Sequence, residues 1–99
     1  MTNITDVGQL IDTGIVNFIE YMEHISFSEI VSTVKMLEME LGRTSILKDN
    51  IHEGMSNLVD DPEEHDRLSR EFIQTYVVEQ KIQDRVDICK EYARRKGVL

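Results

Sequence analysis

The sequence predicts an all-α fold of three helices, in which a long antiparallel helical hairpin carries a shorter N-terminal helix on its base. Three observations predict it. Apolar residues recur in steps of three and four over most of the chain, three N-capping signals divide the periodic stretches, and Pro62, the one proline, stands where the two longest stretches meet. The 99 residues have the length of one domain, so we expect residues 1–99 to fold as a single unit.

The first helix is expected at about residues 7–24. Asp6 can accept hydrogen bonds from the unpaired N–H groups of a helix start, and Gln9 stands three residues on, as in a capping box. The apolar residues that follow have helical spacing: Val7, Leu10, Ile11, Ile15, Phe18, Ile19, Met22 and Ile25. We therefore expect one amphipathic helix whose apolar side packs on the rest of the chain.

The second helix is expected at about residues 27–58. Ser26 and Glu29 have the spacing of a capping box, and Ile25 and Ile30 stand at the two positions of a hydrophobic staple. This pattern predicts a tight corner before the helix. The stripe along the helix advances in steps of four and three through Ile30, Val34, Leu37, Leu41, Thr44, Lys48, Ile51, Met55 and Leu58.

The third helix is expected at about residues 62–96. Asp61 is placed as the N-cap, Pro62 occupies the first helical position, where its missing N–H costs no hydrogen bond, and Glu64 completes a capping box. Its stripe runs through Leu68, Phe72, Thr75, Glu79, Ile82, Val86, Cys89 and Ala93. Near its end, basic residues are expected to face the negative end of this helix before a glycine stops it: Arg94, Arg95, Lys96 and Gly97.

A joint as short as Asp60–Asp61 makes the two long helices antiparallel neighbours. Aligning their stripes from that joint places Leu41 opposite Ile82. The same alignment brings the polar members of the two stripes together: Thr44, Lys48, Thr75 and Glu79. We expect Lys48 to pair with Glu79 and to form a polar layer that sets the register of the two helices.

The N-terminal helix is shorter than the hairpin and should cover only its base, which leaves a two-helix arm at about residues 45–77. Gly42 leaves an alternative open, because glycine often follows the last residue of a helix. If the second helix ends there, the chain folds instead into a compact four-helix bundle, in which the residues of the arm fill one core.

The acidic balance of the chain bears on its partners and location. With 11 basic and 19 acidic residues the formal net charge is -8, which repels the phosphates of nucleic acids and anionic membrane surfaces. No apolar stretch is long enough to span a membrane. Cys89 is the single cysteine and cannot form an internal disulfide, and the first residues lack the basic start of a signal peptide. We therefore expect a cytoplasmic protein that binds neither nucleic acid directly nor a membrane.

Acidic residues and His65 crowd around the proline, which raises the question of a metal or catalytic site. Helix capping accounts for Asp61 and Glu64, and the chain enters a helix too soon after the joint to form a calcium-binding loop. Cys89 belongs to an apolar stripe that carries no histidine or cation to activate a thiol. We expect no catalytic residue, no metal and no cofactor, and hence a protein that is not an enzyme.

The apolar excess on the arm is the strongest indication of function. Two helices cannot bury all of its apolar side chains along one narrow interface, and surface of this kind marks self-association or docking. The expected interaction residues are Leu47, Ile51, Met55, Leu58, Leu68, Phe72, Ile73, Tyr76 and Val77. We therefore expect a helical interaction module, such as an assembly factor, chaperone or regulatory adaptor, that forms a homo-oligomer or binds another protein.

The charge distribution supports an alternative function. Residues 1–89 carry a net charge of -11 and residues 90–99 a net charge of +3, which sum to the total of -8. A rigid acidic rod can imitate the phosphate rows of DNA. The alternative is therefore a DNA mimic, of the kind that phages encode, that inhibits a nucleic-acid-binding protein.

Overall fold

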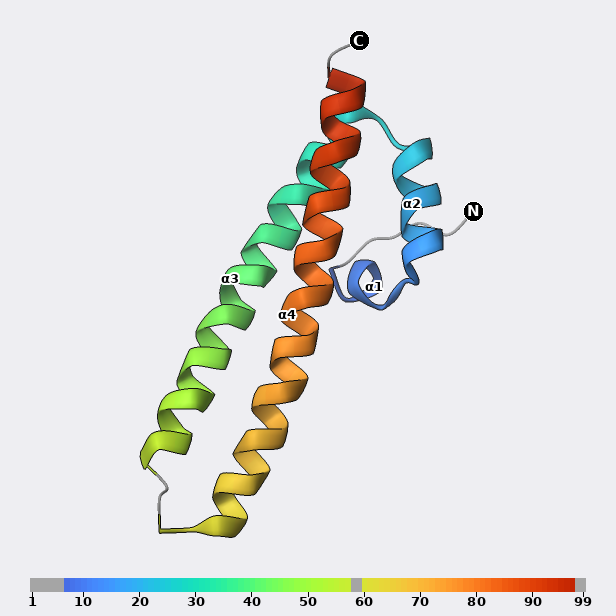
Figure 1. Ribbon diagram of the computed structural model, residues 1–99. Coiled ribbons are helices and arrows are strands. Elements are labelled where there is room, and N and C mark those ends of the chain that lie inside the picture. The colour runs from blue at the N-terminus through green and yellow to red at the C-terminus, as the bar shows by residue number, and fades with distance from the viewer. Residues whose placement is uncertain (1–6, 58–59, 98–99) are drawn as a thin grey trace.

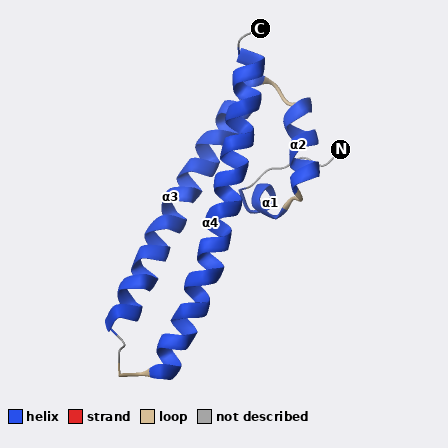
Figure 2. Ribbon diagram, in the orientation of Figure 1, coloured by secondary structure: helices blue, strands red, loops and turns tan. Residues whose placement is uncertain are grey.

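The fold is all-α and is dominated by two long antiparallel helices that lie side by side (Figures 1 and 2). A computed structural model describes residues 7–57 and 60–97, and these residues form helices and no strand. The helices are α1 (Val7–Asp12), α2 (Ile15–His24), α3 (Phe27–Asn57) and α4 (Pro62–Gly97). The predicted hairpin and its helix boundaries are confirmed to within one residue over the described part of the chain.

The α3 helix runs without interruption through Gly42, so the alternative of a four-helix bundle broken at this glycine is wrong. An isolated glycine inside a helix costs about 1 kcal/mol relative to alanine. Leu37, five residues before Gly42, and Thr44, two residues after it, are both buried. Because packing of the helix against α4 on both sides of the glycine is worth more than that cost, the helix continues.

The predicted single helix at residues 7–24 is wrong in one respect, because it is broken into α1 and α2. Gly14 has extended backbone angles, φ -57° and ψ 151°, and it is the N-cap residue of α2. Just before it, the Thr13 N–H and hydroxyl both donate to the Gln9 carbonyl, at 2.9 and 2.6 Å. Glycine is the poorest helix former after proline, so this is where a helix breaks at least cost.

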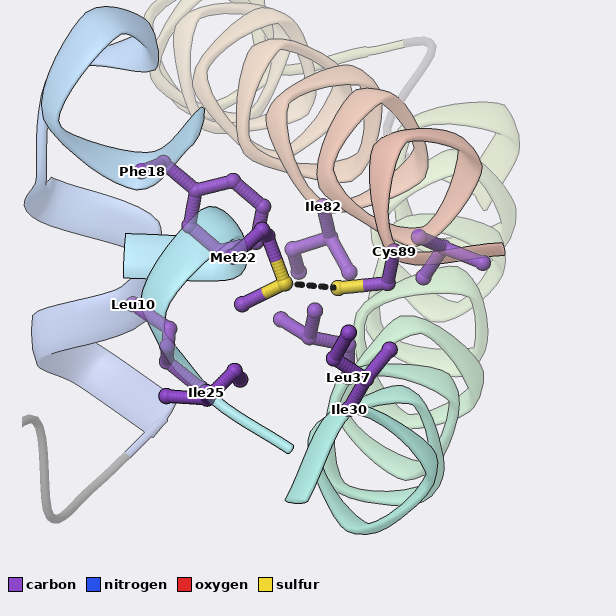
Figure 3. Close-up of a cluster of buried hydrophobic side chains, with 9 residues drawn as sticks. Leu10, Phe18, Met22, Ile25, Ile30, Leu37, Ile82 and Cys89 are labelled. Atoms are coloured by element: carbon purple, nitrogen blue, oxygen red, sulfur yellow. Dashed lines mark hydrogen bonds between the residues drawn. The ribbon is translucent and has the colours of Figure 1, made fainter. Parts of the chain in front are cut away.

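The short helices pack on the base of the hairpin, as predicted. Phe18 and Met22 of α2 and Leu10 of α1 are fully buried against the two long helices. Figure 3 shows these side chains of the short helices facing side chains of the two long helices. Together they form one cluster, which comprises Leu10, Phe18, Met22, Ile25, Ile30, Leu37, Ile82, Val86 and Cys89. Each fully buried side chain of this size contributes about 1.5–3 kcal/mol of transfer free energy, so the base is the main source of stability.

Two of the three predicted helix starts are seen in the described residues. The Glu29 N–H donates to Ser26 Oγ and the Glu64 N–H donates to Asp61 Oδ1, both at 3.2 Å. Ile25 is extended, with φ -96° and ψ 160°, which forms the tight corner between α2 and α3. The third predicted cap, on Asp6, lies outside the described residues.

Candidate interaction surface

A polar contact crosses the interface between α3 and α4 in the middle of the hairpin. Lys48 Nζ lies 2.8 Å from Glu79 Oε1, so the expected ion pair is present. Ser45 Oγ donates to the other carboxylate oxygen, Glu79 Oε2, at 2.7 Å. Hydrogen bonds from Lys48 and then from Ser45 lower the pKa of the buried Glu79 carboxyl, and the hydrogen bond to Glu79 raises the pKa of Lys48.

The two threonines expected in this layer take no part in the bonds that cross it. Thr44 donates its hydroxyl to the Glu40 carbonyl, and Thr75 donates to the Glu71 carbonyl, each at 2.8 Å within its own helix. Ser45 was not among the expected residues, although its position three residues before Lys48 places it on the same side of α3. The cross-helix layer therefore consists of Ser45, Lys48 and Glu79.

The predicted interaction residues fall into two groups. Ile51 is buried, and Met55, Leu68 and Phe72 are half-buried in the contact between the two long helices. Four others are exposed, at 53% for Leu47, 61% for Ile73, 48% for Tyr76 and 47% for Val77. Leu58 lies outside the described residues. Part of the predicted surface is thus the inside of the hairpin, and only the second group remains open to a partner.

The exposed apolar residues do not all point the same way. Ile73 precedes the buried Ile82 by nine residues, or two and a half turns, so it faces directly away from the interface. Ile46 stands in the same relation to the buried Leu37, and it is 63% exposed. Tyr76 lies over the polar layer, with Lys48 Nζ at 5.7 Å from its ring centroid. Ile73 and Tyr76 are three residues apart and hence neighbours on α4, whereas Ile46 lies on α3 and is separate from them.

A smaller apolar surface lies on the arm just beyond α1. Val78, a further exposed residue, precedes Arg85 by seven residues, or about two turns, so both lie on one side of α4. Arg85 contacts α1, which defines that side as the one the short helices cover. Leu47 comes two positions after Ser45, and two positions turn a helix through more than half a revolution. Leu47 therefore lies on the edge of α3 opposite the one that carries Ser45. Val77 precedes the buried Val86 by nine residues, so like Ile73 it faces away from the interface. We call Leu47 and Val78 the arm face.

Sequence reasoning did not single out Val78. The signal was available, because Tyr76, Val77 and Val78 are consecutive, and no more than one or two of three consecutive helical residues can face a single partner helix.

Arg85 attaches α1 to the hairpin and was also missed. Its guanidinium, 4% exposed as a residue, donates from Nε to the Leu10 carbonyl at 2.8 Å and from Nη2 to the Thr13 carbonyl at 2.5 Å. These carbonyls lie at the C-terminal end of α1, where helix carbonyls lack partners and favour a cation. Burial lowers the pKa of Arg85. Arg85 stands three residues after Ile82 and four before Cys89, both of which belong to the apolar stripe. This spacing could have indicated that the Arg85 side chain is buried.

Lys96 serves α2 in the same way, which corrects its expected role at the end of its own helix. Lys96 Nζ donates to the carbonyls of Met22, Glu23 and Ile25, at 3.0, 3.2 and 2.6 Å. Arg94 and Arg95 instead pair with the Glu91 carboxylate, at 2.7 and 3.1 Å. Each short helix therefore has its C-terminal end held by a cation of α4.

Two further candidate groups are the single cysteine and the acidic and histidine side chains. Cys89 is fully buried beside Met22, with its Sγ 3.5 Å from the Met22 Sδ, and burial raises its pKa to about 12. Within residues 7–57 and 60–97, no three His, Cys, Asp or Glu side chains lie close enough together to hold a metal ion. None of the described helices is both long and apolar enough to cross a membrane.

Comparison with known proteins adds no relative. No protein-family model matches the chain, and no curated protein or solved structure is significantly similar to it.

Proposed function

We propose that this protein is a non-enzymatic helical interaction module that uses the arm face to dimerise or to bind another protein. The observation that carries the proposal is the unequal covering of the hairpin. The short helices α1 and α2 lie against the base, and no third helix among the described residues lies against the arm (Figure 1). An assembly factor, a chaperone or a regulatory adaptor would each use such a module.

The position of the arm face supports this proposal. Leu47 and Val78, both exposed, continue on the arm the side of the hairpin that the short helices cover at the base. A helix laid along them would extend the same three-helix layer. Burial of apolar surface on association is worth about 25 cal/mol per Å² before the costs of binding are subtracted, so a partner helix has a driving force at this place.

The charge of the arm favours an antiparallel arrangement if the partner is a second copy. Residues 45–77 contain eight acidic and three basic residues, a net charge of -5, and five of the acids lie between residues 60 and 66. A parallel dimer would bring two of these acidic tips together. An antiparallel dimer separates them, so repulsion between like charges is smaller.

The acidic-mimic alternative has less support. The molecule measures 58 Å along its longest axis. Duplex DNA carries one charge per about 1.7 Å, or roughly 34 charges over that length, against a net charge of -8 here. We therefore retain the interaction module as the proposed function. If a mimic, the protein should bind a nucleic-acid-binding protein in competition with DNA and lose that binding steeply with added salt.

The experiment is light scattering after size exclusion, over a wide range of protein concentration, on the double variant Leu47→Gln with Val78→Gln. If the arm face dimerises, the wild-type chain becomes dimeric at high concentration and the double variant stays monomeric. The matched control is Val16→Gln with Met39→Gln, which removes two apolar side chains away from the arm that are more exposed, at 72% and 62%, than Leu47 and Val78, at 53% and 37%. The control should dimerise like the wild type.

A wild-type chain that remains monomeric at every concentration and does not bind an apolar dye would contradict an adhesive arm face. Dimerisation that the control variant abolishes equally would place the contact elsewhere.

A further inference from the structure

A second apolar surface lies at the base of the hairpin, on the face opposite the short helices. It is an open groove of about 550 Å³ between α3 and α4. On α4, Arg94 lines the groove, whereas Tyr92 and Lys96, each two residues from it, bond to α2. Two residues turn a helix through more than half a revolution, so the groove and α2 occupy opposite sides of α4.

The walls of the groove are apolar side chains that the core leaves exposed or half-exposed. Phe27, Val31 and Val34 come from α3, and Ala93 comes from α4. The Phe27 ring closes one end, where it lies against Gly97 so closely that a Cβ atom on Gly97 would be 2.9 Å from Phe27 Cε2. None of the glycines in the described residues has a positive φ, so Gly97 permits this close approach rather than a left-handed helix end.

The charged residues around the groove are mainly basic, in contrast to the rest of the molecule. Lys35, Lys90 and Arg94 line it together with one acid, Glu38, a local charge of +2 in a chain of net charge -8. Arg94 is already paired with Glu91. Among the described residues, Lys35 and Lys90 make neither a hydrogen bond nor an ion pair. Two unpaired lysines, one on each long helix, thus border an apolar groove.

We propose that this groove binds an amphipathic helix of a partner protein, with the apolar stripe of that helix on Val31 and Ala93 and its carboxylates at Lys35 and Lys90. Lys90, one of the two lysines in this proposal, belongs to the basic segment at residues 90–99, which lies outside the arm. An apolar stripe flanked by charges is how helices bind in grooves, and complementary charge sets the choice of partner.

A second copy of this chain is a poor occupant. A two-fold interface places the same patch of both copies face to face, so groove against groove would bring Lys35 and Lys90 of one copy against those of the other. Juxtaposed like charges oppose such association. The groove therefore calls for a different, acidic protein, and it is independent of the arm face.

The experiment uses the full chain and two labelled synthetic helical peptides, which share a leucine stripe and carry either glutamates or lysines beside it. Binding is followed by fluorescence anisotropy and by shifts of the backbone amide signals in NMR spectra. The glutamate peptide should bind and shift the signals of Val31, Ala93 and their neighbours. The double variant Lys35→Glu with Lys90→Glu should weaken this binding by roughly tenfold or more, since it replaces two attractions with two repulsions.

The matched control is Arg43→Glu with Lys81→Glu, which makes the same change in net charge with one exposed residue on each long helix outside the groove. It should weaken binding by no more than about twofold, because distant exposed charges are screened. Circular dichroism checks that both double variants are folded.

Equal weakening by the two double variants would overturn the proposal, because the effect would then be one of overall charge. It would also be overturned if the lysine peptide bound the groove as tightly, or if saturating glutamate peptide shifted only signals of the arm. Neither result bears on dimerisation through Leu47 and Val78, which light scattering measures separately.

Discussion

Arg85 and Lys96 are single side chains on which whole elements depend. The α1 helix has 6 residues and α2 has 10, lengths at which isolated helices are not stable in water. Each helix ends in carbonyls without helical partners, and a cation of α4 donates to them. These hydrogen bonds join segments more than seventy residues apart in the sequence, so they stabilise the tertiary arrangement as well as the helix ends.

Replacing Arg85 with alanine should lower the free energy of unfolding by about 2–3 kcal/mol, because it leaves the Leu10 and Thr13 carbonyls without their charged donor. Urea denaturation followed by circular dichroism measures this. Arg85→Lys should recover only part of the loss, since an ammonium group lacks the planar set of donors that reaches both carbonyls. A variant as stable as the wild type would mean that α1 is held by its apolar contacts alone.

At the scale of the elements, the contact between α3 and α4 combines apolar packing with one polar layer. The layer lies close to the boundary between the base, where the short helices add a third layer, and the arm, where they do not, because Glu79 precedes Arg85, which bonds to α1, by only six residues. An ion pair buried in this way adds little net stability, because desolvation offsets the attraction between the charges. Its expected contribution is to select one alignment of the two helices.

Glu79→Leu should leave the free energy of unfolding at neutral pH unchanged or higher, because it removes the desolvation cost of the carboxylate, and the Lys48 side chain, 22% exposed, can extend its charge into solvent. The pKa of Glu79 is lowered in the folded protein from 4.5, so its stabilising effect is present above pH 4.5 and is lost as the pH falls through the folded value. The leucine variant has no such loss. Its stability relative to the wild type should therefore increase as the pH falls below about 4.5, as measured by urea denaturation at a series of pH values.

Ser45→Ala provides a partial control, since it removes one hydrogen bond to the carboxylate and should weaken this pH dependence without abolishing it. A large loss of stability in Glu79→Leu at neutral pH would contradict the weak net contribution of the ion pair.

The whole molecule is an elongated rod with its core at one end. Its Cα radius of gyration is 16.7 Å, compared with about 13 Å for a compact domain of this length. The extra length is the arm, which adds surface without adding to the core cluster. The two proposed interfaces follow from this shape, because the arm face lies where the third layer stops and the groove lies where no third layer covers the opposite side.

Cys89 reports on the opening of this core. Its pKa of about 12 leaves roughly one thiol in ten thousand ionised at pH 8, and the side chain is fully buried beneath α2. Alkylation at pH 8 should therefore be at least about a hundredfold slower in the folded protein than in the urea-unfolded chain. Arg85→Ala should accelerate labelling, because it loosens the short helices. Rapid labelling of the wild type would show that α2 leaves the hairpin readily.

Much of the fold could be predicted because its signals are local. The capping interactions of Ser26 and Asp61 span only three residues, and the stripes of α3 and α4 repeat every three or four. The short joint then determines the pairing, and from it the contact between Lys48 and Glu79 could be predicted. Local signals could not predict that the helix breaks at Gly14 and continues through Gly42. Gly42 and Gly14 have the same intrinsic preference, and only the contacts around each one decide whether the helix continues.

The exposure of the site residues depends on the tertiary structure for a related reason. Periodicity identifies an apolar face of a helix, but it does not say how wide a face the neighbours bury. Phe72 and Leu68 are half-buried whereas Tyr76 and Val77 are exposed, although all four were predicted to form one surface. The groove at Phe27 and Lys90 could not be predicted at all, because it arises from two helices that are distant in sequence.

The sequence alone determined the helical class, the boundaries of the long helices and their register, because capping and periodicity act between residues a few positions apart. Only the tertiary structure decided that Gly14 breaks a helix and Gly42 does not, that Arg85 and Lys96 bind the ends of other helices, and which apolar side chains stay exposed. These outcomes depend on energies of contact between distant segments. Local signals were sufficient to predict the helix start at Asp61, but they were not sufficient to predict which apolar side chains of the arm are exposed.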